Sequence, residues 1–486
     1  MTGYRAGVAT RSAQTAPLVA PIEFGDIERM AGPLVVVRGV EGVGWDDFAR
    51  IQVDGAAPRH GIVLDVDRDL AVVEVLEGTD GLALASTRVA FSGSPMRIPV
   101  GSDWLGRVCN GRGEPIDGGP PVTGEVWADV GGAPLNPTAR DTPADPIMTG
   151  IGVIDALTTL VRGQKLPVFS VGGLPHLELA AQIAAQANAG DEPFAVVFAG
   201  MGVTHADADA IRDVLEVRAE QDELTLLINT ADDPVIERVL TPRLALTVAE
   251  HLAFVGGRHV LVVMADMTSY SDAVRQVASA RGEIPGRRGY PGYLYSDLAS
   301  IYERCGRIKG VAGSITEIPV LTMPGGDITH PVPDLTGYIT EGQIVLSPEI
   351  EARGVYPPVD PLASLSRLMR RGAGPGRTRA DHLDLAAQLL ALLARAREVQ
   401  DLTELLGASG LSETERQYLA FVEAFYGSFV DQRRDESLEL GDILDRAWAT
   451  ASLLPRRELT MLGEAALDRY YRPRAGSATD ARGDRS

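Results

Sequence analysis

The segment VFSVGGLPHLEL, residues 168–179, has the outline of a phosphate-binding loop: an apolar run, two glycines, and a helix opened by a proline. A working loop of this kind places a lysine against the phosphate oxygens and a Ser/Thr hydroxyl on magnesium. His176 and Leu177 stand in those two places here, and Pro175 removes one backbone donor. The segment therefore keeps the shape of an anion site and lacks its cation and its metal ligand.

Two interpretations of this segment stay open. As a degenerate nucleotide loop, it offers weak binding candidates at Ser170, Gly172, Gly173 and His176. Glycines let a backbone approach a phosphate closely, and a histidine can carry a positive charge near neutral pH. As an ordinary strand–turn–helix unit of a doubly wound sheet, it needs only a proline in the first helical turn, and His176 then packs or faces a subunit interface.

Other residue types that could do chemistry are few. Asp266 ends the apolar run HVLVVMAD, at the carboxyl end of an expected buried strand, where α/β sheets bind ligands. Because Leu177 supplies no hydroxyl for a metal, we expect Asp266 to cap the following helix instead. Cys109 and Cys305 are too few and too far apart for a disulfide framework or a zinc site, so we expect reduced packing residues.

The composition is that of a soluble globular chain of about three domains, with 486 residues, 45% hydrophobic and 23% charged. Its formal net charge of −21 argues against a nucleic-acid partner, because a phosphate backbone would be repelled. No stretch approaches the roughly 20 apolar residues of a membrane span. The N-terminal MTGYRAGVATRSAQTAP lacks the apolar block of a secretory signal, so a cytoplasmic location is expected.

From about residue 22 to 100 the apolar runs are short and bounded by Gly, Asp or Pro: GPLVVVRGV, FARIQV, GIVLDVDRDLAVVEVLEG and RVAFSG. The third run holds two alternating strands around DRD, which predicts a hairpin. Strands at such short spacing indicate a small β-barrel. Between residues 120 and 146 proline and glycine dominate, which predicts a connecting segment.

From about residue 150 to 370 near-continuous apolar runs alternate with helical stretches; the runs are FAVVFAGM, LTLLINT, HVLVVMAD, IPVLTM and QIVLS. Runs that are apolar on both faces predict a doubly wound parallel sheet covered by helices on both sides. Residues 371–382, RGAGPGRTRADH, have the composition of a flexible joint. Beyond them, HLDLAAQLLALLARAREVQDLTELLG and SETERQYLAFVEAFYGSFVDQ carry apolar residues at helical spacing, which predicts a helical bundle.

Five long blocks carry a resemblance to a known family: RGQKLPVFSVGGLPHLELAAQIA, ADDPVIERVLTPRLALTVAEHLAF, EIPGRRGYPGYLYSDLASIYERCGRIKG, GSITEIPVLTMPGGDITHPVPDLTGYITEGQIVLS and YPPVDPLASLSRLM. Together they closely resemble the non-catalytic B subunit of the V/A-type (vacuolar and archaeal) rotary ATPases and ATP synthases. The resemblance runs from about residue 25 to at least residue 382.

With the periodicities above, this resemblance implies a multidomain chain. Its parts are an N-terminal β-barrel, a central α/β doubly wound parallel sheet that is P-loop NTPase-like and of RecA type, and a C-terminal α-helical bundle. The expected limits are a flexible N-terminus (1–20), a β-barrel (21–100), a degenerate nucleotide-binding domain (101–370), a helical domain (371–473) and a disordered tail (474–486).

The resemblance also implies which catalytic parts are missing. In the catalytic subunits of that superfamily, the loop lysine and threonine would fall on His176 and Leu177. The Gly-Glu-Arg whose glutamate activates water would fall on Gly202, Val203 and Thr204. The loss of cation, magnesium hydroxyl and base removes three recurring parts of phosphoryl transfer. The chain is thus expected to have no cofactor of its own, with ATP or ADP and Mg bound mainly by a partner.

At position 177 the chain departs from the B-subunit pattern as well. That family usually follows Leu-Pro-His with asparagine, and this chain has Leu177. The departure weakens the case for a nucleotide in the degenerate site.

Arg367 carries the chemistry that is left. In the family, the arginine of a Ser-x-Ser-Arg segment reaches across the subunit interface to the γ-phosphate of ATP in the catalytic neighbour, and the matching segment is residues 364–367, SLSR. Arginine suits this role because its planar, permanently charged guanidinium can form paired hydrogen bonds to phosphate oxygens. The resemblance therefore implies Arg367 as an arginine finger in trans, with Ser366 beside it at the interface. Without the resemblance, Arg367 would be one surface arginine among many.

The block EIPGRRGYPGYLYSDLASIYERCGRIKG interleaves basic and aromatic residues, as some nucleic-acid surfaces do. The residues concerned are Arg287, Arg288, Tyr290, Tyr293, Tyr295 and Arg304. The overall negative charge and the family match favour a subunit contact or a packing role.

The resemblance implies a regulatory B subunit that couples ATP synthesis or hydrolysis to ion transport, with protons as the expected ion. Its expected partners are a catalytic A subunit, alternating with it in a three-plus-three ring, and subunits of the central rotor stalk and the peripheral stalk. It would meet the cytoplasmic face of a membrane only through the assembled complex. Two alternatives stay open: a catalytic hexameric ATPase such as a RecA-type helicase or secretion motor, and a pure assembly scaffold.

Overall fold

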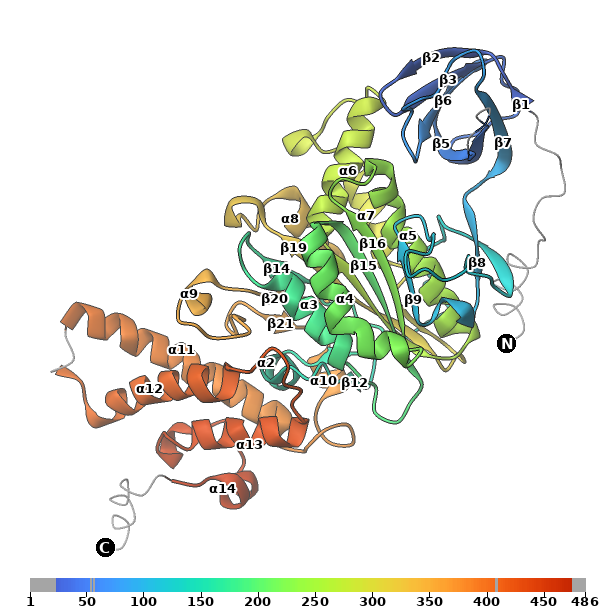
Figure 1. Cartoon of the computed structure of the whole chain (residues 1–486). Helices are drawn as coiled ribbons and strands as arrows, with labels where there is room; N and C mark the ends of the chain where they lie inside the picture. The colour runs from blue at the N-terminus through green and yellow to red at the C-terminus, as the bar shows by residue number, and fades with distance from the viewer. Residues whose placement is uncertain (1–22, 53–54, 56, 407–409, 474–486) are drawn as a thin grey trace, which may run out of the picture. The chain divides into compact units, whose positions relative to one another are not determined.

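The computed structural model describes residues 23–52, 55, 57–406 and 410–473 (Figure 1). The ends expected to be flexible or disordered, residues 1–20 and 474–486, lie outside this part of the chain. Contacts between Cα atoms divide the chain into two compact units. The first comprises Met1–Asp141, Pro193–Pro319 and Thr329–Thr336, and the second comprises Thr142–Glu192, Val320–Ile328 and Gly337–Ser486. These units do not follow chain order, and the domain limits expected from the sequence stay a prediction.

The first unit begins with a seven-stranded antiparallel sheet. Its strands are β1 (Glu23–Phe24), β2 (Ile27–Ala31), β3 (Leu34–Arg38), β4 (Asp47–Gln52), β5 (Arg59–Asp67), β6 (Leu70–Val75) and β7 (Arg88–Pro95), in the order β1-β7-β4-β5-β6-β3-β2. The sheet curls around a core of alternating valine, isoleucine and alanine side chains (Figure 1). The predicted hairpin is confirmed: Asp67 pairs with Leu70, and Arg68 adopts the positive φ of 54° that this tight turn requires.

The same unit holds most of the α/β sheet. Its strands are β9 (Arg107–Asn110), β15 (Phe194–Val203), β16 (Leu224–Thr230), β17 (His259–Ala265) and the first part of β19 (Ser314–Thr322); its longer helices are α4 (His205–Glu220), α5 (Val235–Glu250), α6 (Met267–Ala280) and α7 (Leu294–Tyr302). Shorter strands are β8 (Arg97–Val100), β10 (Val126–Asp129), β11 (Arg140–Asp141) and β18 (Gly306–Ile308).

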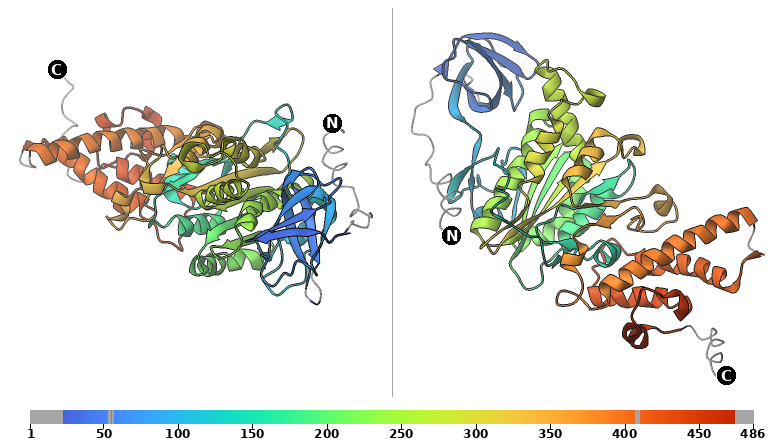
Figure 2. Two further views of the ribbon diagram at one scale, coloured as in Figure 1. Left: turned by 90° about the horizontal axis from the view of Figure 1, so that it is seen from above. Right: turned by 180° about the vertical axis from the view of Figure 1, so that it is seen from behind.

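The expected parallel arrangement is confirmed. Strand β15 pairs in parallel with β16 on one side and with β17 on the other, and nearly every residue of these strands is buried. Helix α4 connects β15 to its neighbour β16, whereas α5 leads from β16 back to β17 on the other side of β15, and α6 follows β17. Because these crossovers are right-handed, α4 lies on one face of the sheet, and α5 and α6 lie on the opposite face (Figures 1 and 2). Burial on both faces explains why these strands lack apolar–polar alternation.

The second unit holds strands β14, β20 and β21 and the end of β19. Strand β14 (Val168–Ser170) pairs in parallel with the end of β19 and with β20 (Gly342–Val345), and β21 (Leu365–Ser366) adds an antiparallel edge to β20. Smaller elements of this unit are β12 (Pro146–Ile147), α2 (Gly152–Leu157), β13 (Leu160–Val161), α3 (His176–Gln186), α9 (Pro348–Glu351) and α10 (Met369–Gly372). Helix α8 (Pro331–Ile339) begins in the first unit and ends in the second.

The C-terminal helices confirm the predicted bundle. They are α11 (His382–Leu406), α12 (Glu413–Ala424), α13 (Leu440–Ala451) and α14 (Glu464–Tyr470), with a π-helical turn at Phe425–Val430. Helix α12 begins with a capping box, in which the Ser412 hydroxyl accepts from the Glu415 N–H and the Glu415 carboxylate accepts from the Ser412 N–H. Along the described chain, none of the helices combines the length and the hydropathy that spanning a bilayer requires.

The prediction of a flexible joint at residues 371–382 is wrong for its last residues, 379–382, which tertiary contacts hold in place. Arg379 pairs with Asp381, and Asp381 also accepts a hydrogen bond of 2.6 Å from the Trp448 indole. His382 is fully buried, with its Nε2 2.9 Å from the carbonyl oxygen of Ala156. Composition failed here because the contacts that order the segment come from residues distant in sequence.

Candidate functional site

The loop between β14 and α3 has the strand–turn–helix path expected of a nucleotide loop. Ser170 is buried at the end of β14, Gly172 and Gly173 are exposed, and α3 begins at His176. Gly173 has a φ of 91°, a conformation that L side chains rarely adopt, which accounts for a glycine at this position. The outline of an anion loop is therefore present in the backbone.

Two backbone N–H groups of this loop bond to carbonyl groups of the loop itself. The Leu174 N–H bonds to the Val171 carbonyl at 3.3 Å, and the His176 N–H bonds to the Leu174 carbonyl at 2.8 Å. Pro175 between them has no N–H. A phosphate-binding loop needs its N–H groups free to face the anion. Two N–H groups of the loop are thus already satisfied within it.

The side chain of His176 also bonds within its surroundings. Its Nδ1–H donates to the Leu174 carbonyl at 2.9 Å, and its Nε2 lies 3.4 Å from Thr322 Oγ1 on β19. In the first turn of α3, Glu178 is paired with Arg434, so a carboxylate occupies the end of the helix that would favour an anion. Leu177 is partly buried. These contacts agree with the packing interpretation of His176, and its weak nucleotide-binding role stays a prediction.

The positions that would carry a catalytic glutamate hold no acid. Strand β15 extends through Val203, two residues beyond the expected run FAVVFAGM, and the Val203 side chain is 4% exposed. Thr204 is the N-cap of α4 and accepts from the Asp207 N–H at 3.2 Å. The Arg238 guanidinium lies 2.9 Å from the place that a Cβ at Gly202 would take. The segment is occupied by packing and capping contacts.

The expected role of Asp266 as a cap is confirmed. Its Oδ1 accepts from the Thr268 N–H at 2.5 Å, and Asp266 is the N-cap of α6. A hydrogen bond to an N-terminal backbone donor stabilises both the helix end and the ionised carboxylate.

Arg367 follows the edge strand β21 and has an exposed side chain. Its N–H donates to the Glu341 carbonyl at 3.0 Å, and its Nη1 donates to the Thr340 carbonyl at 3.2 Å. Among the described residues, no carboxylate lies within ion-pair distance of its guanidinium. A positively charged group therefore lies directly after the edge strand β21, with most of its donors available.

Residues of the Ser-x-Ser-Arg segment alternate in orientation, as a strand requires. Ser364 and Ser366 are 8% and 7% exposed, whereas Leu365 is 54% exposed. The Ser366 hydroxyl donates to the Thr159 carbonyl at 3.3 Å and accepts from Gln164 at 3.0 Å. Ser366 was expected at an interface, but its hydroxyl faces the interior of the chain. The reason is that successive side chains of a strand point to opposite sides.

Three residues near Arg367 were not identified from the sequence: Gln164, Lys165 and Glu341. Gln164 is fully buried, and Lys165 pairs with Glu341 at 2.9 Å between Nζ and Oε1. All three belong to the segments that contact Arg367 or Ser366 through hydrogen bonds. The only signal in the sequence was that RGQK and ITEGQ stand inside blocks that resemble the family.

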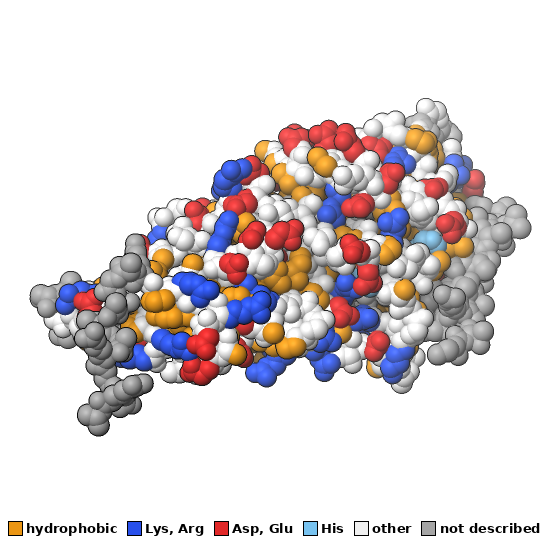
Figure 3. Space-filling view, turned by 90° about the horizontal axis from the view of Figure 1, so that it is seen from below, with side chains coloured by type: hydrophobic (Ala, Val, Ile, Leu, Met, Phe, Trp, Pro, Cys, Tyr) orange, Lys and Arg blue, Asp and Glu red, His pale blue; other side chains and the backbone are white. Residues whose placement is uncertain are grey.

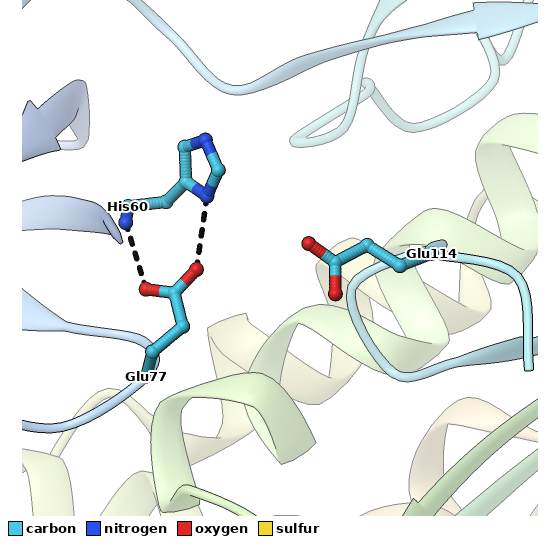
Figure 4. A group of neighbouring side chains, drawn as sticks. All are labelled: His60, Glu77 and Glu114. Carbon is cyan, nitrogen blue, oxygen red and sulfur yellow. Dashed lines mark hydrogen bonds and ion pairs between the residues drawn. The ribbon is translucent and has the colours of Figure 1, made fainter. Parts of the chain in front are cut away.

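A second cluster of titratable groups lies in the first unit. His60 Nδ1 is 2.9 Å from Glu77 Oε1, and Glu114 lies opposite them (Figure 4). This spacing could suit a metal ion, but Arg112 bonds to Glu114 at 2.5 Å and lies 3.7 Å from Glu77. The buried Glu237 carboxylate is 3.6 Å from the same guanidinium. Arg112 thus supplies the positive charge that this group of carboxylates requires.

Part of the basic and aromatic run packs within the first unit, whereas Tyr293 and Tyr295 are 39% and 47% exposed. Arg304 is fully buried and donates to Glu250 at 2.7 Å and to Thr247 at 2.8 Å, and Arg287 pairs with Asp334. The Tyr290 hydroxyl donates to Asp272 at 3.0 Å. On the face drawn in Figure 3, basic and acidic side chains are interspersed. These contacts confirm packing as the role of Arg304 and Tyr290.

The two cysteines are buried free thiols, as expected. Cys109 lies on β9, where burial raises the pKa of its thiol to about 12, and the Cys305 thiol donates to the Ile315 carbonyl at 3.0 Å. A protonated thiol is a poor nucleophile and metal ligand, so both cysteines pack.

Comparisons with known proteins agree with this architecture. The beta-barrel domain model of the ATP synthase alpha/beta family matches residues 27–93, the nucleotide-binding domain model of that family matches residues 150–366, and the model for the C-terminal domain of V and A type ATP synthase matches residues 371–471. Among solved structures, the chain is similar to the ATP synthase subunit NeqB from Nanoarcheaum equitans. The two are 36% identical with a TM-score of 0.69, and the match covers 87% of this chain and 100% of that chain. The chain therefore belongs to the ATP synthase alpha/beta family and carries the C-terminal domain of the V and A type.

Proposed function

We propose that this chain is the non-catalytic B subunit of a V/A-type rotary ATPase or ATP synthase, and that it donates Arg367 to the nucleotide site of an adjacent catalytic subunit. The observation that carries this proposal is the exposed guanidinium of Arg367, which has no ion-pair partner within the described chain and sits on a hydrogen-bonded strand edge. An arginine left unpaired at a fixed position can serve a partner's anion at little entropic cost.

The surroundings of Arg367 favour contact with another subunit. Leu365, two residues before it, is 54% exposed, and Tyr338, at the end of α8, is 74% exposed. Tyr338 stands two residues before Thr340, whose carbonyl accepts from the Arg367 guanidinium, and exposed apolar side chains are a feature of interaction surfaces. The catalytic A subunit is the proposed occupant of this surface.

The chain's own loop supports the other half of the proposal. It lacks the lysine and the Ser/Thr, Val203 replaces the base, and the N–H groups of Leu174 and His176 bond within the loop. Phosphoryl transfer depends on positioning and on stabilising the developing charge, for which these groups are needed. ATP or ADP and Mg would accordingly bind in the partner, and Arg367 would contribute to the transition state there.

The remaining proposals concern the complex. Three copies of this chain would alternate with three catalytic chains around a rotor, beside a peripheral stalk, and the complex would couple ATP turnover to ion transport, with protons as the ion. The chain would meet the membrane only through this assembly. The family membership and the proposed role of Arg367 support these proposals.

The test uses the purified chain alone and the reconstituted complex with its catalytic partner. We expect no ATP hydrolysis by the chain alone, and we expect Arg367→Ala to lower kcat of the complex by roughly 10³- to 10⁵-fold. Arg212→Ala is the matched control, because Arg212 is an exposed arginine of α4 with only a 3.7 Å ion pair to Asp209. Robust hydrolysis by the chain alone would favour a catalytic hexamer. Normal turnover with Arg367→Ala would favour a scaffold.

A further inference from the structure

The backbone of Arg367 is hydrogen-bonded to Glu341. The Glu341 carbonyl accepts two hydrogen bonds, from the Arg367 N–H at 3.0 Å and from Gln164 Nε2 at 3.2 Å. The neighbouring carbonyl, that of Thr340, accepts from the Arg367 guanidinium at 3.2 Å. The segment just before β20 thus fixes both the backbone and the side-chain direction of Arg367.

Gln164 ties this segment to β21. Its amide group is fully buried, and Nε2 donates to the Glu341 carbonyl and to Ser366 Oγ at 3.0 Å. Its Oε1 accepts from the Val161 N–H at 3.0 Å. One carboxamide therefore joins the turn after β13 to Glu341, just before β20, and to Ser366 of β21, which is followed by Arg367. A carboxamide suits this place because it combines two donors with an acceptor on a rigid plane.

Lys165 binds Glu341 through both its backbone and its side chain. The Lys165 N–H donates to Glu341 Oε2 at 2.8 Å, the Glu341 N–H donates to the Lys165 carbonyl at 3.0 Å, and the Lys165 ammonium pairs with Glu341 Oε1. Lys165 is 3% exposed. The pair is partly buried, since the Glu341 side chain is 29% exposed, and its charge-assisted bonds are stronger than bonds between neutral groups.

We infer that Gln164 is a positioning residue that sets the reach of Arg367 into the partner's nucleotide site, with the Lys165–Glu341 pair supporting it. This inference rests on the proposed function. A misplacement of about 1 Å at a reacting group can cost about 100-fold in rate, so loss of the Gln164 bonds should be visible in turnover.

The test is a double-mutant cycle in the reconstituted complex. Gln164→Leu keeps a side chain of similar volume and removes the hydrogen bonds, and we expect kcat to fall by about 10- to 100-fold with little change in KM for ATP. Inhibition by ADP with aluminium fluoride, which mimics the transferring phosphoryl group, should weaken in parallel. In an Arg367→Ala background, the same change should have no further effect, because Gln164 acts through Arg367.

Two further variants make the result decisive. Gln388→Leu is the matched control, since Gln388 is a buried glutamine of α11 that bonds to the Glu458 carbonyl at 3.2 Å and to the Met461 N–H at 2.8 Å; we expect normal turnover. If Gln164→Leu does not assemble, Ser366→Ala removes only the hydroxyl that accepts from Gln164, and we expect a smaller fall in kcat that also vanishes without Arg367.

The experiment separates failure of the positioning role of Gln164 from failure of the proposed function of Arg367. A large effect of Arg367→Ala together with normal kcat for Gln164→Leu and Ser366→Ala would overturn the positioning role alone. Equal effects of Gln164→Leu with and without Arg367 would show a general structural role and would overturn it as well. Normal turnover with Arg367→Ala would remove the proposed function, and this inference with it.

Discussion

At the scale of single residues, the chemistry of Arg367 depends on the shape of its side chain as well as its charge. A guanidinium offers two parallel N–H donors to one phosphate, whereas an ammonium is a compact, strongly hydrated charge. We expect Arg367→Lys in the complex to lower kcat nearly as much as Arg367→Ala does, with KM for ATP nearly unchanged. Steady-state hydrolysis measures this. A lysine variant that keeps more than about a tenth of the parental kcat would show that charge alone suffices.

How far single residues can be predicted depends on the distance of their partners along the chain. The glycines and the proline of the loop at 168–179 could be interpreted from the sequence, because backbone freedom and a missing N–H are local properties. Gln164 could not, because its hydrogen bonds to Glu341 and Ser366 span 177 and 202 residues. The role of Arg367 itself came from a family resemblance.

At the scale of elements, β21 can lie beside β20 only because residue 342 is glycine. Gly342 has a φ of 149°, and a Cβ there would collide with the Leu365 carbonyl oxygen on β21. We expect Gly342→Ala to lower the free energy of unfolding by roughly 1–3 kcal/mol and to reduce kcat of the complex, because β21 carries Arg367. Urea titration and the turnover assay measure the two effects.

The matched control for that change is Gly337→Ala. Gly337 lies inside α8, and a Cβ there meets nothing within 4 Å. Replacing a helical glycine by alanine should stabilise the chain by about 0.5–1 kcal/mol and leave turnover unchanged. If both alanine variants behaved alike, close packing of β20 and β21 would not be the reason for Gly342.

The loop between β14 and α3 gives a second prediction at this scale. We expect the double variant His176→Lys, Leu177→Thr to show no ATP hydrolysis as a purified chain, because Val203 still stands in the place of the base and the Leu174 N–H still bonds to the Val171 carbonyl. Phosphate release under saturating ATP and Mg measures this. Turnover above background would show that only the two loop side chains were missing.

Elements with a strong local pattern were predictable, and elements ordered by tertiary contacts were not. The buried runs of β15, β16 and β17 could be identified as parallel strands because both of their faces must be apolar. Residues 371–382 have a linker composition, yet His382 is buried against the Ala156 carbonyl, 226 residues away. Composition reports local preference only, so it missed this contact.

At the scale of the whole molecule, three buried carboxyl groups make the stability of the chain depend on pH. Burial raises the pKa of Glu74, of Asp155 and of Glu237 to about 7 in each case. Each group then stays protonated in the folded chain at pH values where the unfolded chain has lost the proton. In this range the three groups bind more protons in the folded chain than in the unfolded chain, so their contribution to the free energy of unfolding decreases as the pH rises toward about 7.

Glu74 allows this to be tested at one position. It is 6% exposed on β6, its Oε2 has no hydrogen-bond partner within the described chain, and the nearby Arg281 offsets the effect of burial only in part. Its pKa rises from 4.5 to about 7 on folding, so ionisation costs up to roughly 3 kcal/mol above pH 7 and nothing well below pH 4.5. Glu74→Gln removes this cost. We expect the variant and the parent to be similar near pH 5 and the variant to be more stable near pH 8.

Hydrogen exchange of β5 and β6 peptides in the full chain measures this difference, because the intrinsic exchange rate cancels when variant and parent are compared at the same pH. Glu41→Gln, at an exposed position of the same sheet region, is the control and should show no pH-dependent difference. If the protection of Glu74→Gln relative to the parent did not increase between about pH 5 and pH 8, the Glu74 carboxyl would ionise without cost. Burial of Glu74 would then make no contribution to the pH dependence of stability.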